Sequence, residues 1–338
     1  MTYYNWLWYH ASRYWAWPLL PLSLLYRGAL FLKTCVDRSN TPQRLSVPVI
    51  VVGNLSVGGT GKTPLVIYLV ERLQARGIKV GVVSRGYRGS ASGDLPVEVN
   101  DHTTPRMVGD EPQLIYQKTK CPIVISKKLA RAAQLLIDKY DVELIVSDDG
   151  LQHRDLARTI EIAVVDGSRG FGNRYLLPAG PLREPLSRIN HVTFVVINGA
   201  LKSQSSDRFL TSHGRCYSMQ MQATKLYTPV YDKYYPADHL TGQCVHACCA
   251  LANPDRFFAT LESLGMSLVK HAFKDHHVYS AADFKFSRKL PIVMTAKDGV
   301  KWMEIAEQGH KMDADAWILE TQLQVDEGFE KELLTMLG

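Results

Sequence analysis

The sequence lacks the patterns that mark several common classes of protein. None of its six cysteines forms a C-x-x-C pair, and we find no RNA-binding signature, no long basic tract and no internal repeat. The net charge of +6 is too small an excess to argue for nucleic acid, although it suits phosphorylated ligands or anionic lipid. We therefore expect no nucleic-acid partner, and no feature indicates an obligate protein partner. The 338 residues are enough for two domains and a sizeable core.

The cysteines favour a reducing compartment. Cys244, His246, Cys248 and Cys249 lie close together, which could suggest a metal site, but they fall on an apolar run that is typical of a core strand. We expect buried free thiols there, with a metal site as the alternative. Free thiols are typical of cytosolic proteins.

Acidic residues are absent before Asp37, and the segment that precedes it is rich in aromatic side chains, including four of the six tryptophans. The apolar run over residues 14–26 is short for a bilayer span, and Pro18 and Pro21 would distort a helix. No basic region precedes the aromatics, which argues against a cleavable signal peptide. Because Trp and Tyr favour the headgroup layer, we expect residues 1–36 to form a membrane-associated helix, spanning or lying flat. A buried helix of the soluble core is the alternative.

A second apolar run ends at Gly53 and leads into a glycine-rich loop. Residues 51–63 read VVGNLSVGGTGKT, close to the phosphate-binding pattern G-x-x-x-x-G-K-[ST], with a serine in place of the first glycine. Lys62 would meet the β- and γ-phosphates and Thr63 would bind Mg²⁺, while loop N–H groups hold phosphate oxygens. A plain glycine-rich turn is the alternative. We predict that the nucleotide is bound by Ser56, Val57, Gly58, Gly59, Thr60, Gly61, Lys62 and Thr63.

Two acids, Asp148 and Asp149, follow the apolar run LIVS. Adjacent carboxylates at the end of a buried strand are costly unless a cation meets them. We expect that cation to be the Mg²⁺ on Thr63 and the triphosphate, with Asp148 as the nearer ligand. A helix-capping acid is the alternative.

Further polar residues occur where loops meet beyond the strands. Asp110, in the sequence GDEP, begins a helix, and a histidine pair follows Asp275. A carboxylate paired with an imidazole can act as general base for an alcohol, whereas a plain N-cap and ordinary core or surface histidines are the alternatives. Arginines in the sequences SRGY and PLREP, Arg85 and Arg183, can grip phosphate, or form structural ion pairs.

Apolar strands alternate with amphipathic helices along the rest of the chain. This pattern predicts an α/β fold of the P-loop NTPase type, with a mostly parallel sheet and helices on both faces. A second α/β pattern begins near Gly242. We therefore divide the chain into a membrane-associated helix (residues 1–36), a P-loop domain (37–210), an irregular connector (211–241) and a smaller C-terminal α/β domain (242–338).

Seven motifs in order closely resemble the tetraacyldisaccharide 4′-kinase family, the lipid A 4′-kinases of Gram-negative bacteria. They are VGNLSVGGTGKT, SRGYRG, GDEP, SDDGLQHR, LLPAGPLREP, FKDHHVYS and MTAKDGVK. The resemblance implies ATP- and Mg²⁺-dependent phosphorylation of the 4′-hydroxyl of a tetraacyldisaccharide 1-phosphate, giving lipid IVA at the cytoplasmic face of the inner membrane. It also implies that Asp110 is the catalytic carboxylate and His276 its partner, with Glu111, Gln152, Arg183 and Glu184 around the acceptor. Where the family leads us to expect an arginine, this chain has Leu129, with Lys128 or Arg131 as candidate replacements.

Three other functions are alternatives to this one. A membrane-associated ATPase switch would use the same loop, but that class often carries an extra lysine early in the loop, where Ser56 stands here. A GTPase is disfavoured because the N-K-x-D pattern is missing, and Lys297 in TAKD lies one place late. A non-catalytic lipid-binding module would leave the phosphate loop and the acid pair unexplained.

Overall fold

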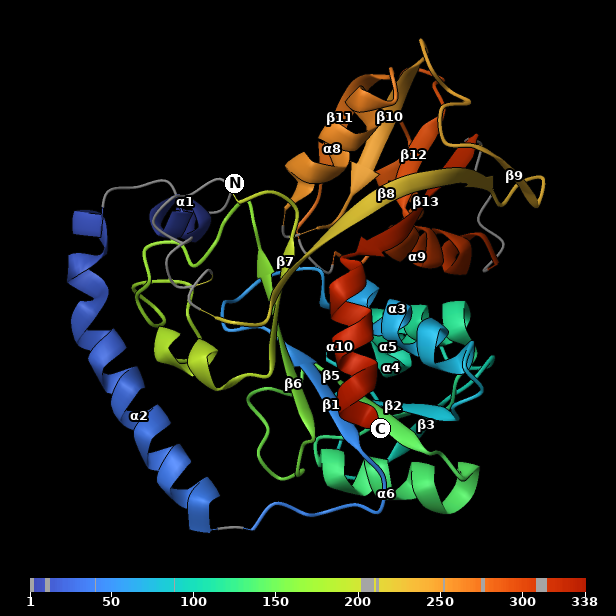
Figure 1. Ribbon diagram of the computed structural model, residues 1–338. Coiled ribbons are helices and arrows are strands. Elements are labelled where there is room, and N and C mark those ends of the chain that lie inside the picture. The colour runs from blue at the N-terminus through green and yellow to red at the C-terminus, as the bar shows by residue number, and fades with distance from the viewer. Residues whose placement is uncertain are drawn as a thin grey trace.

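The computed structural model describes residues 3–9, 13–39, 41–87, 89–201, 210, 213–251, 253–274, 277–307 and 315–338. Within them, one sheet of 13 strands runs through the molecule in the order β11-β10-β12-β13-β8-β7-β6-β1-β5-β2-β4-β3, with β9 paired to β8 (Figure 1). The strands are β1 (Val49–Gly53), β2 (Val80–Ser84), β3 (Val97–Val99), β4 (Ile123–Ile125), β5 (Leu144–Asp148), β6 (Ile160–Asp166), β7 (Phe194–Asn198), β8 (Cys216–Thr228), β9 (Lys233–Pro236), β10 (Cys244–Cys249), β11 (Ser267–Ala272), β12 (Ile292–Thr295) and β13 (Ala316–Val325).

Helices precede β1, separate several of the strands and follow β13. They are α1 (Tyr3–Tyr9), η1 (Arg13–Leu19), α2 (Leu20–Ser39), α3 (Lys62–Gln74), α4 (Pro105–Val108), α5 (Asp110–Thr119), α6 (Leu129–Tyr140), η2 (Leu186–His191), α8 (Pro254–Ser263), η3 (Ala281–Phe284), α9 (Ala296–Glu307) and α10 (Glu327–Leu337).

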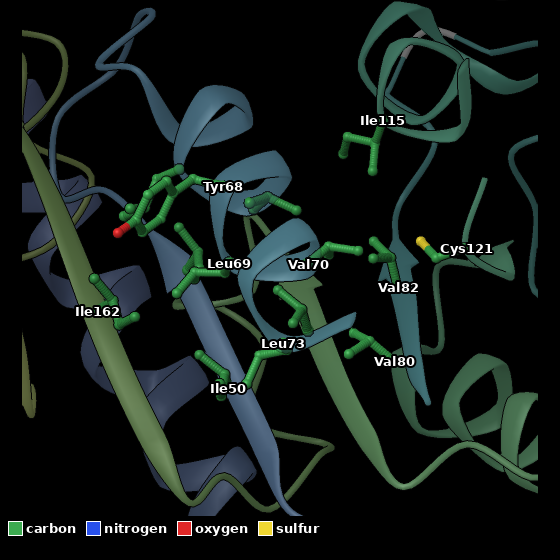
Figure 2. Close-up of a cluster of buried hydrophobic side chains, with 14 of the residues drawn as sticks. Ile50, Tyr68, Leu69, Val70, Leu73, Val80, Val82, Ile115, Cys121 and Ile162 are labelled. Carbon is green, nitrogen blue, oxygen red and sulfur yellow. The ribbon is translucent and has the colours of Figure 1, made fainter. Parts of the chain in front are cut away.

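The strands β1, β5, β2, β4, β6 and β7 form the parallel part of the first half of the sheet. Successive side chains of a strand point to opposite faces. Ile50 therefore packs with Leu69 of α3 on one face, while Val51 packs with Leu136 of α6 on the other. Figure 2 shows the first of these clusters, with the α3 side chains over β1. The predicted α/β sheet with helices on both faces is confirmed.

The second half consists of β10, β11, β12 and β13, which are parallel to one another. The long strand β8 joins the halves, because it pairs parallel with β7 and antiparallel with β13. The expectation of an irregular connector was wrong: residues 211–241 contain β8 and β9. Each half has its own core, but α10 packs back onto the first half, where Phe329 contacts Phe194 at 5.3 Å between ring centroids.

The N-terminal helix α2 stands apart from the sheet at the left of Figure 1. Residues Tyr14–Val36 are long and apolar enough to cross a membrane, and only 6% of that window is buried. Pro18 lies in the 3-10 turn η1, before α2 begins, and Pro21 lies in the first turn of α2. Proline is tolerated in the first turn of a helix, so α2 continues undisturbed beyond it. The alternative of a buried core helix is excluded by this exposure.

Candidate active site

The glycine-rich loop lies between β1 and α3, as the sequence predicts. Gly61 caps α3 with a φ of 99°, a backbone conformation that side chains other than glycine rarely adopt. A Cβ atom at this position would also lie 2.2 Å from Nδ2 of Asn198. The loop therefore requires glycine here for both backbone and packing reasons.

Hydrogen bonds from neighbouring segments fix the shape of the loop. The Nδ2 group of Asn198, at the end of β7, donates to the Thr60 carbonyl at 2.9 Å, and Nδ2 of Asn54 donates to the Gly58 carbonyl at 3.1 Å. Ser56 forms a bridge with Leu182 in extended backbone. This pairing explains why Ser56 can replace the glycine of the usual pattern.

The acid pair ends β5, which neighbours β1 in the sheet. Val52 of β1 lies opposite Asp148, so the register brings both acids beside the loop. Asp149 Oδ1 lies 3.6 Å from Nζ of Lys62, and Asp149 Oδ2 is 3.0 Å from Nη1 of Arg183. Burial opposes ionisation of Asp149, but Lys62 and Arg183 outweigh it and hold its pKa below the usual range.

The surroundings of the Asp148 carboxyl group differ from those of Asp149. The side chain of Asp148 is 1% exposed, and neither carboxylate oxygen has a hydrogen-bond partner. Burial, followed by the charge of Glu111, raises its pKa well above the usual range, although Lys62 acts in the opposite direction. A buried carboxylate without donors is costly unless a cation meets it, so Asp148 fits an oxygen-seeking ion such as Mg²⁺.

A pocket of about 1090 Å³ surrounds these groups and is lined by both halves of the molecule. The first half contributes Val57, Gly58, Gly59, Thr60, Gly61, Lys62, Thr63, Arg85, Glu111, Asp148, Asp149, Arg183 and Asn198. The second half contributes Asn253, Arg256, Thr295 and Lys297, among others. We call this space the nucleotide pocket.

Three predicted acceptor residues form a connected group beside this pocket. Nε2 of Gln152 donates to the Asn54 carbonyl and to Oε1 of Glu184, both at 3.0 Å. Oε1 of Gln152 lies 3.4 Å from Nη1 of Arg183. The group also meets the N-terminal helix, because the hydroxyl of Tyr26 donates to the Arg183 carbonyl at 3.0 Å.

Asp110 lines a separate pocket of about 360 Å³, which we call the second pocket. It adjoins the nucleotide pocket, since Tyr87 lines both and the next residue, Glu111, lines the nucleotide pocket. Oδ2 of Asp110 lies 2.7 Å from Nζ of Lys301, and His277 lines the same pocket. Asp275 and His276 lie outside the described residues, so the pairing of His276 with Asp110 stays a prediction.

Leu129, the first residue of α6, cannot take the place of the expected arginine, because its side chain is apolar, 1% exposed and packed in the core. Lys128 is half exposed, with Nζ 3.5 Å from Oδ2 of Asp94, and like Arg131 it is not among the residues that line the two pockets.

Two site residues were missed from the sequence. Asn198 could have been found as a polar residue at the end of an apolar strand. Lys301 gave a weaker signal, because its partner Asp110 is distant in the sequence.

Several known proteins are similar to this chain in sequence or in structure. The family model described as tetraacyldisaccharide-1-P 4′-kinase matches residues 15–338. A tetraacyldisaccharide 4′-kinase of Hahella chejuensis is 42% identical over 331 residues, covering 96% of this chain and 93% of the relative. One from Stutzerimonas stutzeri is 45% identical, covering 86% of this chain and 85% of the relative. The crystal structure of LpxK from Aquifex aeolicus in complex with ATP has a TM-score of 0.76 at 28% identity, covering 95% of this chain and 98% of that one. The chain belongs to the tetraacyldisaccharide-1-P 4′-kinase family.

Proposed function

We propose that this protein transfers the γ-phosphoryl group of ATP to the 4′-hydroxyl of a tetraacyldisaccharide 1-phosphate, producing lipid IVA for lipid A biosynthesis. The observation that carries the proposal is the nucleotide pocket, where Lys62 and the acid pair at the end of β5 meet a phosphate loop in a member of this kinase family. ATP is bound in the related LpxK crystal structure. Phosphoryl transfer needs positioned groups and cations around the phosphates, and this pocket supplies both.

Thr63 and Asp148 would hold Mg²⁺, with Asp149 behind them. The support is the unpartnered carboxylate of Asp148. The metal would neutralise charge on the β- and γ-phosphate oxygens. Lys62 adds a second positive charge, and Arg183 restrains Asp149 so that its carboxylate stays beside Lys62.

Asp110 would accept the proton of the acceptor hydroxyl, with His276 as its partner. Its support is its place in the second pocket, next to Glu111 in the nucleotide pocket. Arg85, Glu111, Gln152, Arg183 and Glu184 would contact the acceptor and its phosphate. Residues 37–210 and 242–338 would act as the kinase domain and the smaller domain, with 211–241 between them.

The lipid acceptor and the distribution of polar and apolar side chains on α2 support a position of the protein at the cytoplasmic face of the inner membrane. The face of α2 toward the protein carries Ser23 and Tyr26, which hydrogen-bond the backbone of residues 176–183. Its outward face is apolar, formed by Leu22, Leu24, Leu25, Phe31, Leu32 and Val36. A soluble helix has the opposite arrangement. An exposed apolar surface of this kind marks an interaction site, and we assign it to lipid.

The activity is tested with purified protein, ATP labelled at the γ-phosphate, Mg²⁺ and a disaccharide-1-phosphate lipid in detergent. We expect label on the lipid and none on a lipid whose 4′-hydroxyl is blocked. Release of labelled inorganic phosphate without labelled lipid would instead support an ATPase switch.

The membrane assignment is tested with Leu25→Glu. Leu25 is 71% exposed on α2, and Leu95, which is 75% exposed on the segment after β2, provides the matched control Leu95→Glu. We expect Leu25→Glu to reduce the fraction bound to anionic vesicles and Leu95→Glu to leave it unchanged. Equal binding of both variants and the wild type would argue against the assignment.

A further inference from the structure

Lys301 is a buried cation that the proposed reaction has not used. It lies on α9, and only 8% of the residue is exposed. Its Nζ atom is 2.7 Å from Oδ2 of Asp110 and donates a hydrogen bond of 2.9 Å to the His277 carbonyl. Asp110 begins α5 in the first half, whereas His277 follows β11 in the second half. One side chain therefore ties together three segments from both halves.

Burial of a lysine is rare unless the ammonium group is paired. Here the carboxylate supplies the opposite charge and the His277 carbonyl supplies an acceptor. The ring of Tyr279 lies 5.9 Å from Nζ. These contacts fix the ammonium group from several directions, so its position in turn restrains the Asp110 carboxylate.

The start of α9 also binds the segment of residues 277–279 at a second point. The hydroxyl of Tyr279 donates to Oδ1 of Asp298 at 3.1 Å. Asp298 is fully buried and also accepts from Oγ1 of Thr295 and from the backbone N–H of Ala250. Residues 277–279 are thus bound to α9 through a backbone carbonyl and a side-chain hydroxyl. This segment and Asp110 line the second pocket together.

We infer that Lys301 is a positioning residue for phosphoryl transfer, holding the Asp110 carboxylate against the 277–279 segment so that the second pocket has one fixed geometry. The inference rests on the proposed function, in which Asp110 accepts the acceptor proton. In that step the hydroxyl oxygen forms a bond to the γ-phosphorus, the bond from phosphorus to the leaving oxygen of ADP breaks, and the proton passes to Asp110. Lys301 forms and breaks no bond in this step.

The size of the effect follows from the geometry of such reactions. A displacement of about 1 Å in a reacting group can cost about 10²-fold in rate. Because Lys301 lines the second pocket and not the nucleotide pocket, its loss would disturb the acceptor side and leave ATP binding intact.

The first test compares Lys301→Met, Lys301→Gln and Lys301→Arg in the full-length protein. We expect Lys301→Met to lower kcat by about 10²-fold, with KM for ATP within about twofold of the wild type. Lys301→Arg, which keeps the charge, should recover part of kcat, with Lys301→Gln between Arg and Met. The matched control is Lys270→Met, since Lys270 is a half-exposed lysine of the second half paired with Glu262. A melting temperature is recorded for each variant.

A double-mutant cycle with Asp110→Asn separates positioning from mere stability. If Lys301 acts through Asp110, Lys301→Met should change kcat by less than about threefold in the Asp110→Asn background. The inference would be overturned if Lys301→Met lowered kcat as much in the Asp110→Asn background as in the wild type, or if Lys301→Met alone had a kcat near that of the wild type. Either result would leave the role of Asp110 unchanged. A wild-type rate in Asp110→Asn alone would instead reject the proposed base. If Lys301→Met does not fold, the Arg and Gln variants carry the same comparison.

Discussion

The nucleotide pocket and the second pocket share Tyr87, but they are held together in different ways. In the nucleotide pocket, Lys62 and the acid pair follow adjacent parallel strands, and the backbone pairing of β1 with β5 sets their separation. In the second pocket, Asp110 and Lys301 come from α5 and α9, in different halves, and meet only through their side chains.

This difference has a physical consequence. Hydrogen-bonded strands change their register only by breaking the ladder, so the phosphate loop and the acid pair keep a fixed separation, although the second half also lines the nucleotide pocket. A pocket between packed helices depends on how the two halves sit against each other. Binding of ATP and turnover of the acceptor should therefore respond to different mutations.

The largest effect is expected for Lys62→Ala. The change removes the charge that would meet the γ-phosphate, so phosphoryl transfer should fall to background and nucleotide affinity should fall with it. The measurements are label transfer to lipid and a nucleotide-binding titration. Turnover near the wild-type rate would reject the nucleotide pocket as the site of ATP.

Asp110→Asn should be the next most severe. Loss of a general base is worth about 10²–10⁴-fold in kcat, while ATP affinity should stay unchanged because Asp110 lies in the second pocket. Steady-state kinetics with varied ATP and varied lipid separate an effect on kcat from an effect on substrate affinity. A change confined to KM for the lipid would make Asp110 a binding group instead.

Asn198→Ala should have a moderate effect, on the nucleotide side alone. The variant loses the hydrogen bond to the Thr60 carbonyl, worth about 1 kcal/mol, and the dissociation constant for ATP should rise about fivefold. A titration with a non-hydrolysable ATP analogue measures it. An unchanged affinity would show that the loop keeps its shape without Asn198.

The smallest effect is expected for Lys118→Ala. Lys118 of α5 pairs with Glu320 of β13, so this ion pair also crosses between the halves, but its lysine is about a third exposed and screened by water. We expect a loss of no more than about 1 kcal/mol in the free energy of unfolding and little change in kcat. Thermal melting and kinetics test this. A fall in kcat as large as that expected for Lys301→Met would show that the Lys118–Glu320 and Lys301–Asp110 ion pairs matter equally for turnover.

The parts of the fold that depend on local pattern were predictable. The glycine-rich loop lies between β1 and α3, and Asp148 and Asp149 lie at the end of the predicted strand beside that loop. The strand β8 was not predicted, because an exposed joining strand has a weak alternation and its partner β13 is distant in sequence.

The phosphate loop, the acid pair and the alternation of strands and helices could be predicted, because they depend on residues close together in the chain. The support of the loop by Asn198, the contact of Lys301 with Asp110 and the outward apolar face of α2 became visible only in the folded chain. Each of those features depends on the packing of segments that are far apart in sequence, and no local spacing encodes it.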